Sequence, residues 1–80
     1  GMNKEKQKPQ EYTLYVGYDK TGKGVWTNKK GEGVMVFIDV EDAEEYVGKD
    51  KKNRKYKKMR AAEYRKERAE SQGEMMEERE

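Results

Sequence analysis

Apolar and other side chains alternate along the segment 11–19, and the apolar positions are Tyr12, Leu14, Val16 and Tyr18. A period of two predicts a β-strand, because successive side chains of a strand point to opposite faces of a sheet. The segment 19–24 supplies turn residues, and the short run from Val25 to Thr27 is again rich in strand formers. The pattern therefore predicts two strands that form a hairpin.

A third strand is predicted over residues 34–38, where five consecutive apolar residues follow a polar, glycine-containing turn at 28–33. Such a run is apolar on both faces, which is typical of a strand that is central or covered from both sides. Because sequential strands tend to be neighbours in space, we expect an antiparallel three-stranded meander.

A short helix is predicted to begin after Asp39. An aspartate is a good N-cap, and the acids that follow it suit the positive end of a helix dipole. The spacing of Val40, Ala43 and Val47 places them on one helical face, and Gly48 suits the C-terminal cap. We expect this face to pack on the sheet.

Residues 49–73 are nearly all good helix formers and contain no proline, so they predict a long, charged C-terminal helix. The acidic residues 74–80 are expected to fray, and residues 1–10 to form a flexible lead-in. The predicted fold class is α+β, a small three-stranded antiparallel sheet followed by a short helix and this long helix. Residues 11–48 would form the β-β-β-α core of a single folded unit.

Both faces of the predicted sheet carry apolar side chains. One face would hold Leu14, Val16, Val25, Val34, Val36 and Ile38. The other would hold the candidate core or interface residues Tyr15, Trp26, Met35 and Phe37. One short helix cannot cover both faces, so we expect the long helix or a second copy of the chain to cover the rest, and we predict a homo-oligomer, a dimer in the first instance. Alternatively, three of these aromatic rings would form a platform on which single-stranded bases stack.

The sequence contains no cysteine and no histidine. It therefore has no disulfide, no thiolate ligand, and none of the side chain that most often serves as general base or metal ligand. The acidic residues 39–45 lack the spacing of a calcium-binding loop, and helix capping accounts for them. A chain of 80 residues also has little room for a concave pocket. We expect no enzyme, and no bound cofactor, metal ion or small-molecule substrate.

The net charge of +2 conceals one segment with seven cations in ten residues and no acid. This basic segment, residues 51–60, contains the candidate nucleic-acid-binding residues Lys51, Lys52, Arg54, Lys55, Tyr56, Lys57, Lys58 and Arg60. Contacts from such cations to phosphates require no particular base sequence. The leading hypothesis is a small accessory protein that self-associates and binds a polyanion, nucleic acid first of all, through this segment.

A competing hypothesis assigns these cations to the chain itself. They would lie on a solvated helix and balance the acidic residues 39–45 and 74–80. The protein would then be a protein–protein interaction or self-association module with no nucleic-acid role. The two hypotheses differ in whether the cations already pair with the protein's own acids.

No apolar run approaches the length that spans a bilayer, and the N-terminal residues lack the apolar core of a signal peptide. We therefore expect a cytoplasmic protein that makes no membrane contact. Gly1 precedes Met2 and is typical of a residue left by tag removal, so we expect the natural chain to begin at Met2.

Overall fold

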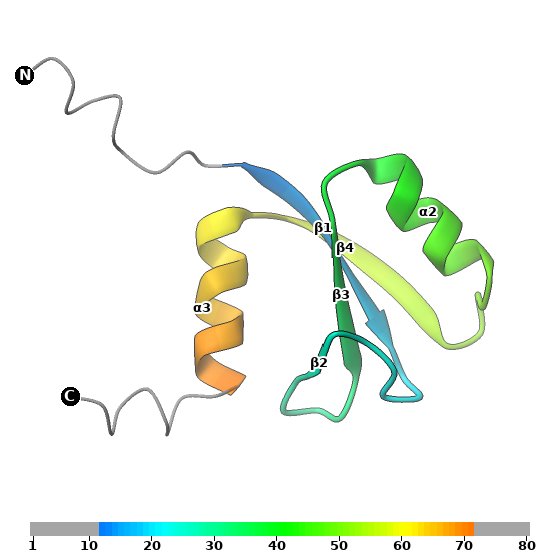
Figure 1. The fold of residues 1–80 in the computed structure, drawn as a ribbon, viewed down its shortest axis with the longest axis horizontal. Coiled ribbons are helices and arrows are strands. Elements are labelled where there is room, and N and C mark those ends of the chain that lie inside the picture. The colour runs from blue at the N-terminus through cyan, green and yellow to red at the C-terminus, as the bar shows by residue number, and fades with distance from the viewer. Residues whose placement is uncertain (1–11, 72–80) are drawn as a thin grey trace, which may run out of the picture.

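The alternating segment forms the central strand of the fold. In the computed structural model, which describes residues 12–71, this strand is β1 (Thr13–Asp19), and it pairs antiparallel with a neighbour on each side. The remaining elements are β2 (Trp26–Thr27), β3 (Gly33–Phe37), α2 (Val40–Gly48), β4 (Arg54–Arg60) and α3 (Ala61–Ser71). The four-stranded antiparallel sheet has the order β2-β3-β1-β4 (Figure 1), so the predicted α+β class is confirmed.

The two loops that flank β2 have the expected turn chemistry. Gly22 and Gly31 have positive φ angles of 88° and 86°, which glycine adopts without strain. In the second loop the side-chain oxygen of Asn28 accepts a hydrogen bond from the backbone N–H of Glu32 at 2.9 Å. Both predicted turns are confirmed, and the strand between them is only two residues long.

α2 begins where the sequence predicts. Asp39 precedes it with extended backbone, and its carbonyl accepts hydrogen bonds from the N–H groups of Asp42 and Ala43. The buried side chains of Ala43 and Tyr46 face the sheet. The Tyr46 ring lies over Gly17, where an added Cβ would come within 2.6 Å of a ring atom. Glycine at this position of β1 therefore permits the close approach of α2.

The long helix predicted over residues 49–73 is wrong. A turn ends α2, and in it the Asp50 carbonyl accepts hydrogen bonds from the N–H groups of Asn53 and Arg54. The Asp50 carboxylate accepts a further hydrogen bond from the side-chain amide of Asn53. The chain then runs as β4 along β1, and within residues 49–71 only α3 is helical. The sheet consequently has four strands instead of the predicted three.

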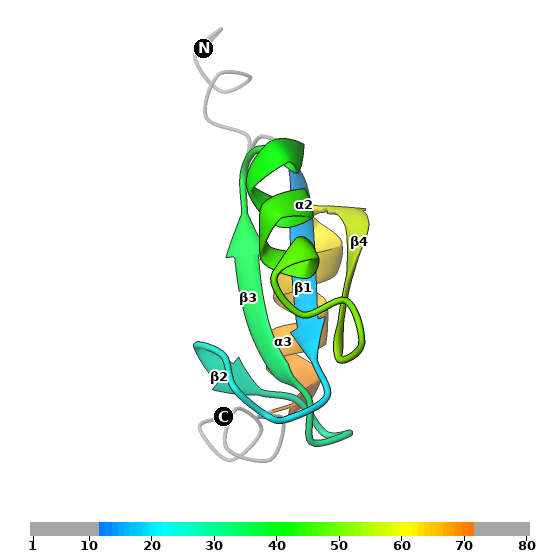
Figure 2. The ribbon, with the colours of Figure 1, turned by 90° about the vertical axis from the view of Figure 1, so that its right-hand side faces the viewer.

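The two helices cover opposite faces of the sheet, and Figure 2 shows α2 in front of the strands and α3 behind them. The α3 face holds the main core, made of the buried residues Leu14, Val16, Tyr18, Val34, Met59 and Ala61. On the α2 face, Ala43 and Tyr46 are the buried helical residues. The C-terminal helix thus covers the second face, which was one of the two expected alternatives.

Three residues depart from their predicted places in the sheet. Trp26 lies opposite Val34 and packs on the α3 face, so it does not share a face with Tyr15 and Phe37. The observed pairing of β2 with β3 differs by one residue from the pairing that would place Trp26 beside Tyr15 and Phe37. A shift of one residue transfers a side chain to the other face of the sheet. Val25 and Ile38 lie beyond the strand ends and are 70% and 69% exposed, so they are not core residues.

The predicted lead-in of residues 1–10 and the predicted acidic tail of residues 74–80 lie outside the described residues. Within residues 12–71, neither helix has the length and apolar character needed to cross a membrane.

Candidate polyanion-binding surface

The basic segment occupies a turn and the edge strand β4. Among residues 12–71, β4 is an edge strand of the sheet and pairs only with β1. Lysines and arginines on an edge strand prevent unwanted pairing with other strands, and this protective role is the simplest account of their presence. A binding role therefore depends on where each cation points and what it already contacts.

The cations of β4 divide between the two faces of the sheet, because successive side chains of a strand alternate. Lys55 and Lys57 lie opposite Tyr18 and Val16 of β1, and they point to the α3 face. The α2-face row consists of Arg54, Tyr56, Lys58 and Arg60. Neighbours within such a row are about 6.8 Å apart along the strand.

Arg54 is the one cation of the basic segment with an ion-pair partner among residues 12–71. Its Nε lies 2.9 Å from Oδ2 of Asp19, whose side chain is 1% exposed. Its guanidinium lies 4.3 Å from the centroid of the Tyr46 ring, and Nη1 donates to the Tyr46 carbonyl at 3.0 Å. Hydrogen bonds from Thr21, followed by those from Arg54, outweigh burial and lower the pKa of Asp19. Arg54 therefore joins the beginning of β4 to the end of β1.

The other six cations are exposed and have no ion pair within the described part of the chain: Lys51, Lys52, Lys55, Lys57, Lys58 and Arg60. In particular, no ion pair joins the basic segment to the acidic residues 39–45. The predicted acidic tail lies outside residues 12–71, so the structure does not test pairing with it. Within the described residues, these six charges face solvent.

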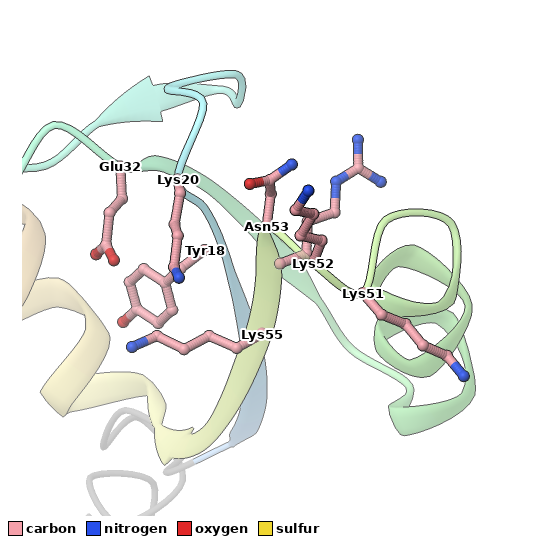
Figure 3. A pocket seen from close by; sticks show the side chains of 8 residues that line it. Tyr18, Lys20, Glu32, Lys51, Lys52, Asn53 and Lys55 are labelled. Atoms are coloured by element: carbon pink, nitrogen blue, oxygen red, sulfur yellow. The ribbon is translucent and has the colours of Figure 1, made fainter.

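A small cleft of about 160 Å³ lies beside Tyr18 and adds Lys20 to the basic surface. Figure 3 shows the side chains of Lys20 and Lys55 extending towards the cleft beside Tyr18, whereas Lys51 points away from it. Glu32 lines the same cleft. The cleft thus combines cations with a carboxylate and with the buried side chain of Tyr18.

The Tyr18 hydroxyl donates to both carboxylate oxygens of Glu67, at 2.9 and 3.1 Å. Burial, and then this hydrogen bond to Glu67, raise the pKa of Tyr18 well above its ordinary value. The amino groups of Lys55 and Lys57 lie 5.8 and 5.7 Å from the centroid of the same ring. The α3-face cations are therefore attracted to an aromatic ring beside a carboxylate, which weakens their attraction for an external anion.

The α2-face row presents a different combination. The Tyr56 ring packs edge-on against Tyr15, with 6.1 Å between the ring centroids and 76° between the ring planes. The Tyr56 hydroxyl donates to Oε2 of Glu44 at 3.4 Å. Both rings are half-buried, and the adjacent Lys58 and Arg60 are exposed. Aromatic surface and exposed cations thus share one strip of the sheet.

Of the four predicted core or interface residues, all of which are half-buried, the structure keeps Tyr15, Met35 and Phe37 on the α2 face and places Trp26 on the α3 face. The Trp26 indole N–H donates to the Tyr64 hydroxyl at 3.0 Å on the α3 face. Phe37 packs against Tyr46 of α2 with 5.2 Å between centroids. The predicted platform of Tyr15, Trp26 and Phe37 is therefore wrong.

Sequence reasoning missed Asp19 and Glu44 as parts of this surface. Asp19 falls in the predicted turn, and its partner Arg54 is 35 residues away along the chain. Glu44 is one of the acids that suit the helix dipole, and its contact with Tyr56 depends on the unpredicted strand β4. No local pattern indicates either contact.

Comparison of the chain with protein-family models, with curated proteins and with solved structures finds no match. The function is therefore inferred from the residues and the geometry described above.

Proposed function

We propose that this protein is a small, non-enzymatic accessory protein that binds a polyanion, specifically nucleic acid, through the basic segment. The supporting observation is the set of six exposed cations that have no ion-pair partner among residues 12–71. A protein gains affinity when such cations neutralise phosphates, because condensed counterions are released from the nucleic acid. An edge strand offers its cations in extended rows, along which a phosphate backbone can run.

The decisive experiment measures binding to labelled duplex and single-stranded DNA and RNA across a salt series. The test variant replaces the six exposed cations of the basic segment by glutamine and keeps Arg54, because removing Arg54 would leave Asp19 buried without its partner. We expect the wild-type protein to bind with a log–log salt slope of roughly −4 to −6 on duplex DNA, and the variant to lose this binding.

A matched control removes the same number of exposed cations elsewhere, at Lys23, Lys29, Lys30, Lys49, Arg65 and Lys66. We expect this control to retain most of the affinity. Equal losses in both variants would mean that net charge alone attracts the nucleic acid, and absence of binding at low salt would reject the proposal.

A second candidate function, self-association, is supported by the opposite edge of the sheet. β2 pairs with β3 only at Gly33 and Val34, and the Val25 N–H donates to the Val34 carbonyl at 2.8 Å; within residues 12–71 no backbone hydrogen bond covers this edge of β3 beyond Val34. The exposed apolar side chains of Val25 and Ile38 flank the uncovered part. Unlike β4, this edge carries no charged side chain from Val34 to Ile38, so a second copy can pair with it about a two-fold axis.

Sedimentation at micromolar concentration tests this candidate. We expect a dimer that Ile38→Lys dissociates, because a lysine on an open edge opposes strand pairing. Ala62→Lys adds the same charge at an exposed position of α3 and serves as the control. A wild-type protein that sediments as a folded monomer would contradict self-association and leave polyanion binding unaffected.

A further inference from the structure

We propose that the α2-face row of β4 is a binding site for single-stranded nucleic acid, in which bases stack on the Tyr15–Tyr56 pair and Lys58 and Arg60 hold the phosphates. This inference rests on the proposed polyanion binding and identifies the class of polyanion. It assigns stacking to a tyrosine pair instead of the three-ring platform that the sequence suggested.

The Tyr56 ring is held in place from two directions. Its edge-on contact with Tyr15 fixes one side, and its hydroxyl donates to the Glu44 carboxylate on α2 at 3.4 Å. Neither tyrosine is fully buried, so each keeps part of its surface open to solvent. A ring whose orientation is set before binding loses less conformational entropy when a base stacks on it.

The register of β4 on β1 places the cations next to these rings. Lys58 lies directly opposite Tyr15, and Arg60 lies opposite Thr13. The order along the row is therefore an aromatic residue and then two cations, at intervals of about 6.8 Å. A single strand that runs along this row can place phosphates against the cations while a base turns towards the rings.

The bases of a duplex stay stacked on one another, so an aromatic ring on a sheet cannot stack on them. Unpaired bases, by contrast, stack readily on exposed aromatic side chains, and cationic grooves follow their phosphates. A tyrosine pair that is half exposed and lies beside cations is therefore expected to favour single strands over duplexes.

The α3 face lacks this combination. Tyr18 is 3% exposed, and Lys55 and Lys57 lie over its ring, so a base cannot reach it. The half-buried Trp26 lies on β2, at the edge of the sheet opposite β4, and its ring already contacts the Arg68 guanidinium, 5.6 Å from its centroid, and the Tyr64 ring. Among the described residues of β4, only the α2-face row joins accessible aromatic surface to cations without ion pairs.

Glu44 is the charge that opposes an anion at this site, because its carboxylate contacts the Tyr56 hydroxyl. We expect Glu44→Gln to strengthen binding of a single strand about threefold at low salt, since one nearby like charge is removed. A purely structural role for Glu44 would produce no gain.

The central test uses labelled oligothymidine and oligouridine of about twelve nucleotides, a length within the known site sizes of small single-strand-binding folds, together with a duplex of the same length. The double variant Tyr15→Leu/Tyr56→Leu is expected to lose roughly tenfold or more in affinity for both single strands and little for the duplex. Tyr56→Phe keeps the ring and loses only the hydrogen bond to Glu44, so it is expected to lose much less affinity than the double leucine variant. Circular dichroism verifies that each variant is folded.

Two double variants that each remove two cations provide a matched control, because neither alters the tyrosine rings. Lys58→Gln/Arg60→Gln and Lys55→Gln/Lys57→Gln remove equal charge from the two faces of one strand. We expect the first pair to weaken single-strand binding several-fold more than the second. Equal effects, or duplex affinity equal to single-strand affinity with no effect of the tyrosine variants, would overturn this inference and leave polyanion binding standing. A wild-type protein that binds no nucleic acid would contradict both the single-strand site and the proposed polyanion binding.

Discussion

The two faces of the sheet are stabilised in different ways. The α3 face is filled by aliphatic side chains of β1 and β3 together with Met59 and Ala61. The α2 face buries an ion pair, Asp19–Arg54, and requires a glycine beneath the Tyr46 ring. Apolar burial is non-directional and tolerates moderate change, whereas a buried charge needs its partner and a close contact needs its space. Conservative substitutions should therefore damage the α2 face more.

The largest expected effect comes from Arg54→Gln. Asp19 would remain buried with a negative charge and without its cation, which should lower the free energy of unfolding by about 3 kcal/mol. Urea unfolding measures the change. Arg60→Gln removes the same charge from an exposed position of the same strand, and it should change stability by less than about 0.5 kcal/mol. Similar decreases in the free energy of unfolding of the two variants would show that the buried Asp19–Arg54 pair stabilises the fold no more than an exposed charge does.

A somewhat smaller effect is expected from Gly17→Ala. The new methyl group would lie 2.6 Å from the Tyr46 ring, so α2 or the ring must move, and such overpacking costs typically 1–3 kcal/mol. Thermal unfolding measures the loss, and adding Tyr46→Leu to the same chain should recover part of it. Gly48→Ala is the control, because nothing lies within 4 Å of an added Cβ there. A neutral Gly17→Ala would contradict the tight contact on this face.

The smallest effect is expected on the α3 face from Tyr18→Phe. Loss of the hydrogen bond to Glu67 should cost about 1 kcal/mol at neutral pH. The pKa of Tyr18 is raised in the folded protein, so its contribution is complete below the ordinary tyrosine value of about 10 and is lost as pH rises through the higher folded value. Wild-type and variant stabilities should therefore converge above pH 10. Tyr12→Phe, at a position that is 61% exposed, should change neither the free energy of unfolding at neutral pH nor its dependence on pH.

Much of the fold was predictable because its elements carry local patterns. The alternation in β1, the turn glycines and the aspartate before α2 each predicted the observed element. β4 was missed because its residues are mostly lysine and arginine, which are good helix formers, and because an edge strand exposes polar side chains on both faces. Gly48 and the turn residues Asp50 and Asn53 are local signals that α2 ends here, but none of them indicates that a strand follows.

The candidate site was predictable in composition but not in arrangement. Charge density alone identified residues 51–60. Which cation is structural and which are exposed depends on the pairing of β4 with β1, a long-range contact that propensities do not contain. The same register decides that Tyr56 meets Tyr15 and that Trp26 faces the other way.

β4 and α3 follow each other without a connecting residue, since Arg60 ends the strand and Ala61 begins the helix. The Ala61 N–H also donates to the carbonyl of Tyr12 at 2.8 Å, which ties the start of the helix to the beginning of β1. The number of residues in β4 therefore determines which side of α3 faces the sheet. One inserted residue at this junction would turn the helix by about 100° about its axis and carry Tyr64 and Glu67 off the sheet together.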